Sequence, residues 1–272
     1  MHRTGVLEVL SIISRENTER LMDVAIIGAG MAGLTAAWRL KRENARVLVF
    51  ERNYKPGGRM NTRRKAGLVV DHGNRFILRS SPVLRELIVD CGLHGEAKTI
   101  ERPIYDLHTD GSFTESVTEE AKSDRLCFPE GMLTLPEALR RSTGGFYSIR
   151  VTSVVHDESL GKFIIQTEPP LRQQDTAVDA VIVACPAPMA HQLTLPIHPM
   201  LYEQFVERMS RVQYKRCISL IAALRKVALP EKFYGLYPPS ATSHLQWMAF
   251  EDQKCPARRV EGWSSLVAHA TP

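Results

Sequence analysis

A short apolar run, a glycine-rich turn and a helix-forming stretch follow one another near residue 30, and they constrain the fold more than any other feature. Residues 24–27 are Val-Ala-Ile-Ile, typical of a strand buried on both faces of a parallel sheet. The glycines that follow allow a sharp turn, a close approach of a diphosphate and tight helix packing. We expect a helix over residues 31–42 whose free N–H groups point at the phosphates. The expected binding residues are Gly28, Ala29, Gly30, Met31, Ala32 and Gly33.

An acidic residue ends the next apolar run, residues 47–51. Glu51 lies eighteen positions beyond Gly33, where a carboxylate accepts hydrogen bonds from an adenosine ribose. We include the adjacent Arg52 among the expected contacts. Because strand, glycine turn, helix and terminal acid agree, we interpret the segment as a dinucleotide-binding βαβ unit rather than a purely structural turn.

A second glycine turn with an arginine follows directly. It consists of Gly57, Gly58, Arg59 and Met60, and it allows the arginine and backbone amides to reach the same diphosphate. The alternative is a surface turn opening a solvated basic run, which includes Arg63, Arg64 and Lys65. Behind a complete βαβ signature we favour the binding interpretation.

The paired turns resemble those of the flavin-containing amine oxidase superfamily. Within it, several later segments are similar to renalase-like enzymes: Asp71-His-Gly-Asn-Arg-Phe76, Phe128-Pro-Glu-Gly-Met132, Val181-Ile-Val-Ala-Cys-Pro-Ala-Pro188 and Trp263-Ser-Ser-Leu-Val-Ala-His-Ala-Thr271. The resemblance extends from about residue 22 to the last residue and is most specific in its first forty positions.

This resemblance implies FAD as the cofactor. It places a backbone group of Val154 against the adenine and residues 71–76 near the flavin ring, although 71–76 also fits an ordinary strand-to-loop junction. Ala184, at the end of a buried strand, suits a backbone close to the cofactor, as well as a normal strand end. No catalytic residue is assigned, because hydride transfer to a flavin needs no dedicated general base.

Two sets of side chains have alternative interpretations. Trp247, Phe250 and Trp263 could line a substrate pocket, but aromatic residues in a sheet more often form the core. Cys185 is more consistent with a partly buried bystander than with a nucleophile, since no base or cation is positioned beside it in the sequence.

Composition describes a globular protein of one or two domains. The 272 residues are 44% hydrophobic and 24% charged, with a formal net charge of +5. Basic residues are not interleaved with aromatic ones, so we expect no nucleic-acid partner. The five cysteines are widely spaced and predict neither a disulfide framework nor a metal site, which favours a reducing, cytoplasmic setting. No segment predicts a secretory signal or a membrane span.

We predict an α/β protein with a doubly wound, Rossmann-type FAD domain and an inserted α+β substrate domain on a mixed or antiparallel sheet. The FAD domain comprises residues 22–78 and 129–189, the substrate domain 79–128 and 190–272, and residues 1–21 form an extension. Expected helices cover 82–91 and 199–210, and another ends near 141. Expected strands cover 66–70, 144–155, 162–167, 176–184, 217–224 and 245–250, with a hairpin within 100–117.

The enzymes of the resembled group continue with a strand and a helix that return to the flavin. The sequence stops at Pro272, so we expect either a truncated FAD domain or a partner chain that completes it. The expected function is hydride transfer from a small molecule, such as a dihydronicotinamide isomer, to FAD and then to dioxygen. The alternatives are an amine oxidase, a desaturase-like enzyme or a non-catalytic nucleotide-binding or interaction protein.

Overall fold

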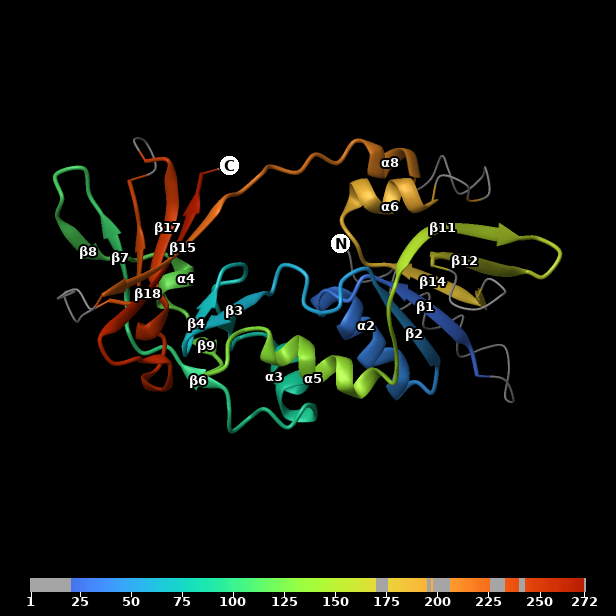
Figure 1. Cartoon of the computed structure of the whole chain (residues 1–272), viewed down its shortest axis with the longest axis horizontal. Helices are drawn as coiled ribbons and strands as arrows, with labels where there is room; N and C mark the ends of the chain where they lie inside the picture. The colour runs from blue at the N-terminus through green and yellow to red at the C-terminus, as the bar shows by residue number, and fades with distance from the viewer. Residues whose placement is uncertain are drawn as a thin grey trace. The chain divides into compact units, whose positions relative to one another are not determined.

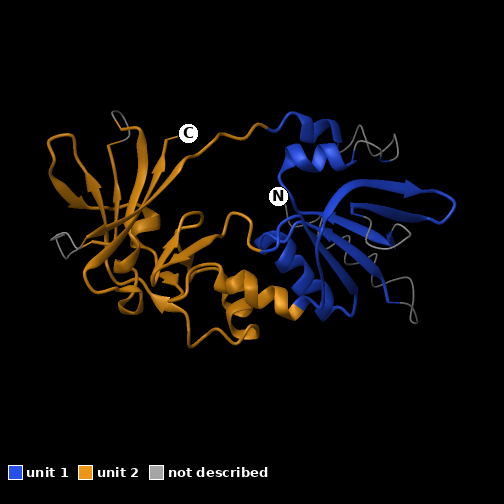
Figure 2. Ribbon diagram, in the orientation of Figure 1, with its two compact units in different colours: residues 1–55, 143–212 blue, residues 56–142, 213–272 orange. Residues whose placement is uncertain are grey.

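The computed structural model describes residues 21–169, 176–194, 197, 206–225, 233–239 and 243–271. The chain passes back and forth between two units, coloured separately in Figure 2. Unit 1 comprises residues 1–55 and 143–212, and unit 2 comprises 56–142 and 213–272. The compact units therefore place residues 56–78 and 129–142 in unit 2 and residues 190–212 in unit 1. The predicted division into an FAD domain and a substrate domain stays a prediction.

The centre of unit 1 is a sheet of four parallel strands, and one helix connects two of these strands. They are β1 (Asp23–Ile27), α2 (Met31–Arg42), β2 (Arg46–Glu51), β10 (Gly145–Ser148) and β14 (Ala180–Val183), as Figure 1 shows. The strand order is β10-β2-β1-β14, and every neighbouring pair is parallel. The helix α2 connects β1 to β2 and buries Leu34, Ala37 and Leu40. This βαβ arrangement confirms the predicted Rossmann-type sheet.

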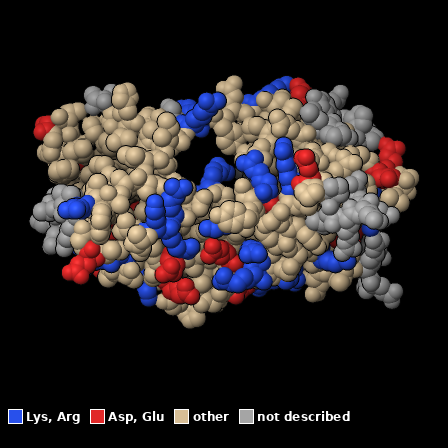
Figure 3. All heavy atoms as spheres, viewed as in Figure 1, with Lys and Arg blue, Asp and Glu red and all other residues tan. Residues whose placement is uncertain are grey.

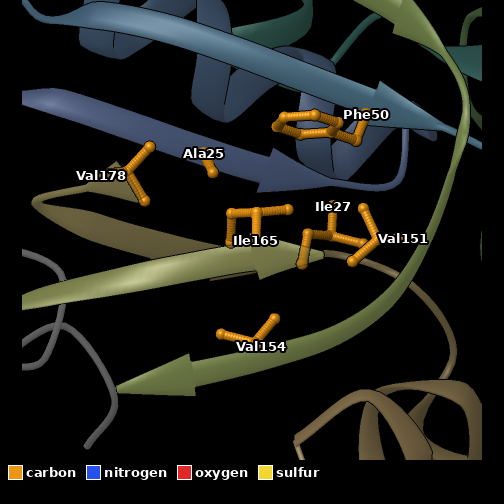
Figure 4. Packing of buried hydrophobic residues seen from close by; sticks show 7 residues of the cluster. All are labelled: Ala25, Ile27, Phe50, Val151, Val154, Ile165 and Val178. Atoms are coloured by element: carbon orange, nitrogen blue, oxygen red, sulfur yellow. The ribbon is translucent and has the colours of Figure 1, made fainter. Parts of the chain in front are cut away.

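A second, antiparallel sheet completes the core of unit 1. Its strands, in order, are β11 (Arg150–Asp157), β12 (Lys162–Glu168) and β13 (Thr176–Val178). Figure 4 shows their side chains facing those of the parallel sheet. The cluster consists of Ala25, Ile27, Phe50, Val151, Val154, Ile165 and Val178, all buried. The helices α6 (Ala187–Thr194) and α8 (Glu207–Ser210) are the other described elements of this unit.

Unit 2 is built on a six-stranded mixed sheet. The strands are β7 (Ile104–Leu107), β8 (Phe113–Glu115), β15 (Ser219–Arg225), β16 (Gly235–Tyr237), β17 (Leu245–Phe250) and β18 (Trp263–Ala270). Their order is β15-β18-β17-β16-β7-β8, and only the β16–β7 pair is parallel. The mixed sheet agrees with the fold class predicted for the substrate domain.

Smaller elements surround this sheet. They are β3 (Thr62–Lys65), β4 (Leu68–Asp71), β5 (Ile77–Leu78), α3 (Pro82–Asp90), β6 (Lys98–Thr99), α4 (Glu119–Lys122), β9 (Arg125–Cys127), α5 (Thr134–Thr143) and the 3₁₀ helices η2 (Glu251–Gln253) and η3 (Pro256–Arg258). β3 and β4 form a hairpin, and β9 lies between β5 and β6. None of the described helices is long and apolar enough to cross a bilayer.

Local signals in the sequence located several elements correctly. The helix α2 has the expected bounds. Ser81 accepts a hydrogen bond from the Leu84 N–H at the start of α3, and Gly92, with φ +69°, follows its end. The hairpin of β7 and β8 turns at residues 108–112, which include the expected Asp110 and Gly111.

Two expected strands are each divided between sheets. The stretch 144–155 forms β10 of the parallel sheet and β11 of the antiparallel sheet. The stretch 176–184 divides at Asp179, whose N–H donates to Asp23 O at 2.9 Å while its carboxylate accepts from Asp23 N at 2.8 Å. These two hydrogen bonds hold the chain at the point where it passes from one sheet to the other. No local residue propensity predicts this change of sheet.

Two further expectations differ in extent. The strand expected over residues 66–70 begins later, as β4 at Leu68, because Ala66 and Gly67, with φ of +51° and +79°, form the turn that joins it to β3. The helix expected over residues 199–210 lies partly outside the described residues, and α8 covers only its last four positions. Residues 1–20 of the expected extension also lie outside the described chain.

Candidate functional site

The turn after β1 contains three glycines, and at two of them a larger residue would clash with the backbone. Gly28 has φ +105°, and a Cβ there would lie 3.1 Å from the carbonyl carbon of Ala184. A Cβ on Gly33 would lie 2.0 Å from the Gly28 oxygen. Such contacts force backbone to move, so these two glycines hold the turn against the start of α2 and the end of β14.

Gly30 differs from the other two glycines because no described residue occupies the space beside it. A Cβ there would meet no atom of the described chain within 4 Å, and its φ of −71° is accessible to any residue. It is the N-cap of α2 and makes no side-chain capping bond. The first helical bond runs from Leu34 N to Gly30 O, so the N–H groups of residues 31–33 have no acceptor within the helix. Open space over such a helix end fits a phosphate.

Glu51 lies directly beside this turn. Its Oε2 accepts a hydrogen bond from Ala29 N at 2.9 Å, and its Oε1 accepts from Asn53 N and Nδ2 at 3.0 and 2.8 Å. The side chain is buried, with 8% of the residue exposed. Each carboxylate oxygen has two acceptor positions, and the bond from Ala29 N occupies one of those on Oε2. The expected acid and the expected turn are therefore brought together.

The remaining predicted contacts of unit 1 differ in position. Ala184 N donates to Ile27 O at 2.8 Å, which holds Ala184 against the glycine turn. The Val154 side chain is fully buried in the apolar cluster, so only its backbone is left to face a ligand. Arg52 is exposed. Burial raises the pKa of the Cys185 thiol, which agrees with the bystander interpretation.

The second glycine turn lies in unit 2, and residues of that unit support it. Gly57 has φ +109°, and a Cβ there would lie 2.6 Å from Met60 O and 2.7 Å from a Leu133 methyl group. Met60 is buried and donates its N–H to Gly57 O at 2.9 Å. Gly58 also has a positive φ, +55°, and Arg59 is exposed. The turn therefore presents the arginine at the surface on a tightly determined backbone.

Residues 71–76 support this turn from the other side. Asn74 N donates to Arg59 O at 3.0 Å, and a Cβ on Gly73 would lie 2.0 Å from that same oxygen. The segment that resembles a flavin contact is thus packed against the second glycine turn. Whether it meets a flavin ring remains a prediction.

A buried ionic cluster supports residues 71–76 and the second glycine turn. It is formed by Asp71, Glu251, Lys254 and Arg258. Asp71 Oδ2 accepts from Lys254 Nζ and from an Arg258 Nη, both at 2.8 Å. Glu251 Oε2 accepts from the other Arg258 Nη at 2.8 Å and pairs with Lys254 Nζ at 2.9 Å. All four side chains are at most 1% exposed.

The cluster also holds the loop that supports Gly57. Asp71 Oδ1 accepts from Met132 N at 2.8 Å and from the Thr62 hydroxyl at 2.7 Å, and Leu133 N donates to that hydroxyl at 3.0 Å. Burial opposes ionisation of Asp71, but Lys254 and Arg258 hold its pKa well below the usual range. Burial raises the pKa of Glu251. Sequence reasoning missed this cluster, because residues 251–258 look like a solvated charged loop.

The three aromatic residues considered for a pocket do not come together. Trp247 is 1% exposed, packs against Tyr234 and Tyr237, and lies under the Arg75 guanidinium at 4.5 Å. Phe250 belongs to a separate apolar cluster with Phe233. Trp263 is 43% exposed. The core interpretation therefore holds for the first two and not for Trp263, whose role in a pocket stays a prediction.

Charged side chains on the face seen in Figure 3 lie in several separate groups, with Lys and Arg among Asp and Glu. Arg59 is exposed, and its distinguishing feature is the constrained turn that carries it.

Two family models match the chain. The description "Flavin containing amine oxidoreductase" applies to residues 106–271, more than half of the chain, and "NAD(P)-binding Rossmann-like domain" applies to residues 26–91. A 4,4'-diapophytoene desaturase from Staphylococcus aureus is 33% identical over 135 residues. That match covers 47% of this chain but only 24% of the desaturase.

Solved structures share the fold at low sequence identity. A putrescine oxidase redesigned in its cofactor site matches with a TM-score of 0.71 at 15% identity, over 92% of this chain and 75% of that one. Reduced UDP-galactopyranose mutase matches with a TM-score of 0.76 at 13% identity, over 92% and 74%. At these identities the likeness establishes the fold alone.

Proposed function

The chain belongs to the flavin-containing amine oxidoreductase family, and from this premise we propose that it is an FAD-dependent oxidoreductase acting on a small molecule. The family match confirms the expected flavin at the level of the family. The observation that carries the proposal for this chain is the bond from Ala29 N to Glu51 Oε2. It joins a buried ribose-binding acid to a helix N-terminus that has open space at Gly30.

The residues of the two turns suggest separate contacts for the cofactor, each described within its own unit. The N–H groups of residues 31–33 and the positive end of the α2 dipole would bind the diphosphate. Glu51 would accept from the ribose, and the backbone near Val154 would border the adenine. Arg59 would neutralise phosphate charge from the second turn. Arg52 and Ala184 complete the proposed contacts, with Gly28, Ala29, Gly57, Gly58 and Met60 shaping the two turns.

When bound, FAD supplies the capacity to accept a hydride and to pass electrons to an acceptor such as dioxygen, with release of hydrogen peroxide. The protein would bind and orient the donor, and no side chain is assigned as a base. We propose a reduced nicotinamide isomer as the donor, on the strength of the renalase-like segments. The dispersed cysteines support a cytoplasmic setting for this reaction.

A desaturase-type reaction is a second candidate. It is favoured by the 33% identity to the diapophytoene desaturase, which is higher than the identity to any of the solved structures described above. Because the match covers a quarter of that enzyme, it supports shared cofactor chemistry more strongly than a shared substrate. Turnover of a dihydronicotinamide isomer with peroxide release supports the first candidate, and turnover of a polyene supports the second.

Two glycine variants test cofactor binding. We expect Gly30→Ala to leave the unfolding midpoint unchanged, since a Cβ meets nothing within 4 Å, but to weaken FAD binding at least about tenfold, or about 1.4 kcal/mol. Gly33→Ala is the matched contrast. Its Cβ would lie 2.0 Å from Gly28 O, so it should destabilise the fold by about 1–3 kcal/mol.

The measurements are the visible absorption spectrum of the purified chain, calorimetric titration with FAD and thermal unfolding of both variants. Flavin absorption that survives gel filtration supports the proposal. Protein that is colourless, and stays colourless after refolding with FAD, overturns it and favours the interaction-protein alternative. Equal FAD affinity in wild type and Gly30→Ala would show that the diphosphate does not lie at this helix end.

A further inference from the structure

The Arg125 guanidinium lies in the interior of unit 2, and most of its N–H donors have no acceptor. Arg125 begins β9, and only 5% of the residue is exposed. Its Nη2 donates to Arg102 O at 3.2 Å, whereas Nε and Nη1 are buried without any acceptor among the described residues. The Nη1 of Arg102 is buried in the same condition. Buried N–H groups are nearly always paired, so these donors point to an acceptor that binds from outside the chain.

A second cation and a further donor lie close to Arg125. The guanidinium carbon of Arg125 is 5.9 Å from the centre of the Phe76 ring, and that of Arg75 is 5.7 Å from the same ring. The Arg75 guanidinium is also 4.5 Å from the Trp247 ring, whose Nε1 is buried without an acceptor in the described chain. Two positive charges therefore share the Phe76 ring, and an unused indole donor lies beside one of them.

The acidic side chain of this region, Glu120, is occupied by other partners. Its Oε1 pairs with an Arg75 Nη at 3.0 Å, and its Oε2 accepts from the Tyr237 hydroxyl at 2.7 Å. No acid in the described part of the chain forms an ion pair with Arg125. Burial lowers the pKa of Arg125, although Glu120 is among the groups that oppose this effect. The region thus retains positive charge, and a buried charge is costly unless an anion compensates it.

The border of this region is open to solvent. The side chains of Arg75 and Glu120 are 28% and 37% exposed, and Arg102 and Tyr237 are partly exposed. Exposed side chains change rotamer rapidly without any change in the backbone. A small anion therefore has a route to the Arg125 donors that needs only side-chain movement.

We propose that Arg125 is the centre of an oxyanion-binding site in unit 2, which takes the carboxylate or phosphate group of a small ligand. A planar guanidinium matches such groups better than an ammonium does, and its charge strengthens each hydrogen bond. Arg102, whose backbone is bonded to Arg125, would supply a further donor. Both residues belong to unit 2, and the site does not rest on the FAD proposal.

The test measures thermal unfolding of the full chain at pH 7 in sodium phosphate, sodium acetate and sodium chloride at equal ionic strength. At about five times the dissociation constant, a bound oxyanion should raise the unfolding midpoint by about 2–4 °C. A rise in phosphate alone assigns the site to phosphate groups, and a rise in acetate alone assigns it to carboxylates. A rise in both supports their shared chemistry. Equal midpoints in all three salts would overturn the proposal.

The variant Arg125→Met tests the assignment, because it removes the donors and the charge while keeping an extended side chain. We expect the oxyanion affinity, measured by calorimetric titration with phosphate and acetate, to fall at least about tenfold. Without added oxyanion, the variant should unfold no earlier than wild type, because a buried charge without a partner has been removed. An unchanged affinity would contradict the assignment.

Two further arginine variants complete the test. Arg79→Ala is the matched control, because Arg79 is exposed, directly follows β5 and donates to Thr99 Oγ1 at 2.8 Å. It should bind oxyanions as wild type does. Arg125→Lys keeps the charge without the planar group, so it should weaken binding severalfold, and it replaces Arg125→Met if that variant does not fold. Equal losses in Arg79→Ala and Arg125→Met would show that net charge, rather than this site, attracts the anion.

A phosphate ion also fits the helix end at Gly30, so Gly30→Ala separates the two proposals. Affinity that Gly30→Ala retains and Arg125→Met loses supports the oxyanion site, whether or not the protein binds FAD. Affinity that Gly30→Ala loses and Arg125→Met retains would overturn the oxyanion site and leave the FAD proposal intact.

Discussion

The two units of this chain are stabilised in different ways. The interior of unit 1, drawn in Figure 4, is an apolar cluster between a parallel and an antiparallel sheet. The interior of unit 2 includes two buried acids and two buried bases that bond to each other and to the backbone. In an apolar interior, the loss of unfolding free energy increases with the side-chain volume that is removed. In a buried ionic cluster, removing one partner causes a large loss at once, because it leaves a buried charge without compensation.

This difference bears on the proposed site. In unit 1 the glycine turn and Glu51 are positioned by main-chain geometry and by the hydrogen bonds that the Glu51 carboxylate accepts from Ala29 and Asn53. In unit 2 the second turn rests on Leu133 and on residues 71–74, which the ionic cluster holds in place. A substitution in the cluster should therefore also disturb the turn that carries Arg59, although no described hydrogen bond joins Arg59 to the four charged side chains.

The largest expected effect comes from removing one charge of the cluster. Asp71→Ala leaves two buried cations with only Glu251 as partner, and we expect a loss of about 3–5 kcal/mol in unfolding free energy. Urea unfolding followed by tryptophan fluorescence in a Trp38→Phe background reports on unit 2, because Trp247 and Trp263 both belong to it. A loss below 1 kcal/mol would show that the cluster does not stabilise this unit.

Acid should produce a related but smaller effect, since a protonated carboxyl still forms hydrogen bonds. The pKa of Asp71 is lowered from 3.8 in the folded state, so its contribution is complete well above pH 3.8 and is lost as the pH falls below that value. Glu251 acts in the opposite sense. Its raised pKa means that its ionisation costs stability as the pH rises through the folded value.

Urea unfolding between pH 2 and pH 7 measures both effects. We expect the steepest loss of unit 2 stability below pH 3.8, and a flatter profile in Asp71→Asn. If unit 1, followed through Trp38 fluorescence in a background with both Trp247→Phe and Trp263→Phe, showed the same acid dependence, the contrast between the units would fail.

A conservative change in the apolar cluster should have a moderate effect. Ile165 is 1% exposed, and Ile165→Val removes one methylene, so we expect a loss of about 0.5–1.5 kcal/mol without any new pH dependence. Denaturant unfolding at pH 5 and pH 7 should give the same difference. A pH-dependent difference would indicate that charge also contributes to this interior.

The smallest effect should come from a surface ion pair of unit 2. Glu130 lies 3.7 Å from Arg64, and its side chain is 71% exposed. Glu130→Ala should change the unfolding free energy by less than about 1 kcal/mol. This variant is the control for Asp71→Ala, because it removes a carboxylate from the same unit without leaving a buried charge. A loss as large as that of Asp71→Ala would mean that burial is not what distinguishes the two carboxylates.

Local sequence patterns were enough to predict those structural features whose physical cause lies within a few neighbouring residues. The apolar run before Gly28, the steric need for glycine there and at Gly33, and the cap at Ser81 depend on residues within one turn or one strand. These patterns predicted the βαβ unit, the bounds of α2 and the placing of Glu51 beside the turn. The family match then confirmed the class of protein to which they pointed.

Tertiary structure decided what depends on residues far apart in the chain. Asp71 meets Lys254 and Arg258 across more than 180 positions, and the Cys127 thiol donates to Lys254 O across 127. Asp179 divides one apolar run between two sheets by bonding to Asp23. The sequence does not distinguish a solvated charged or thiol side chain from a buried one. Only folding removes water from such a side chain, and its effect on stability then depends on the partner that it meets.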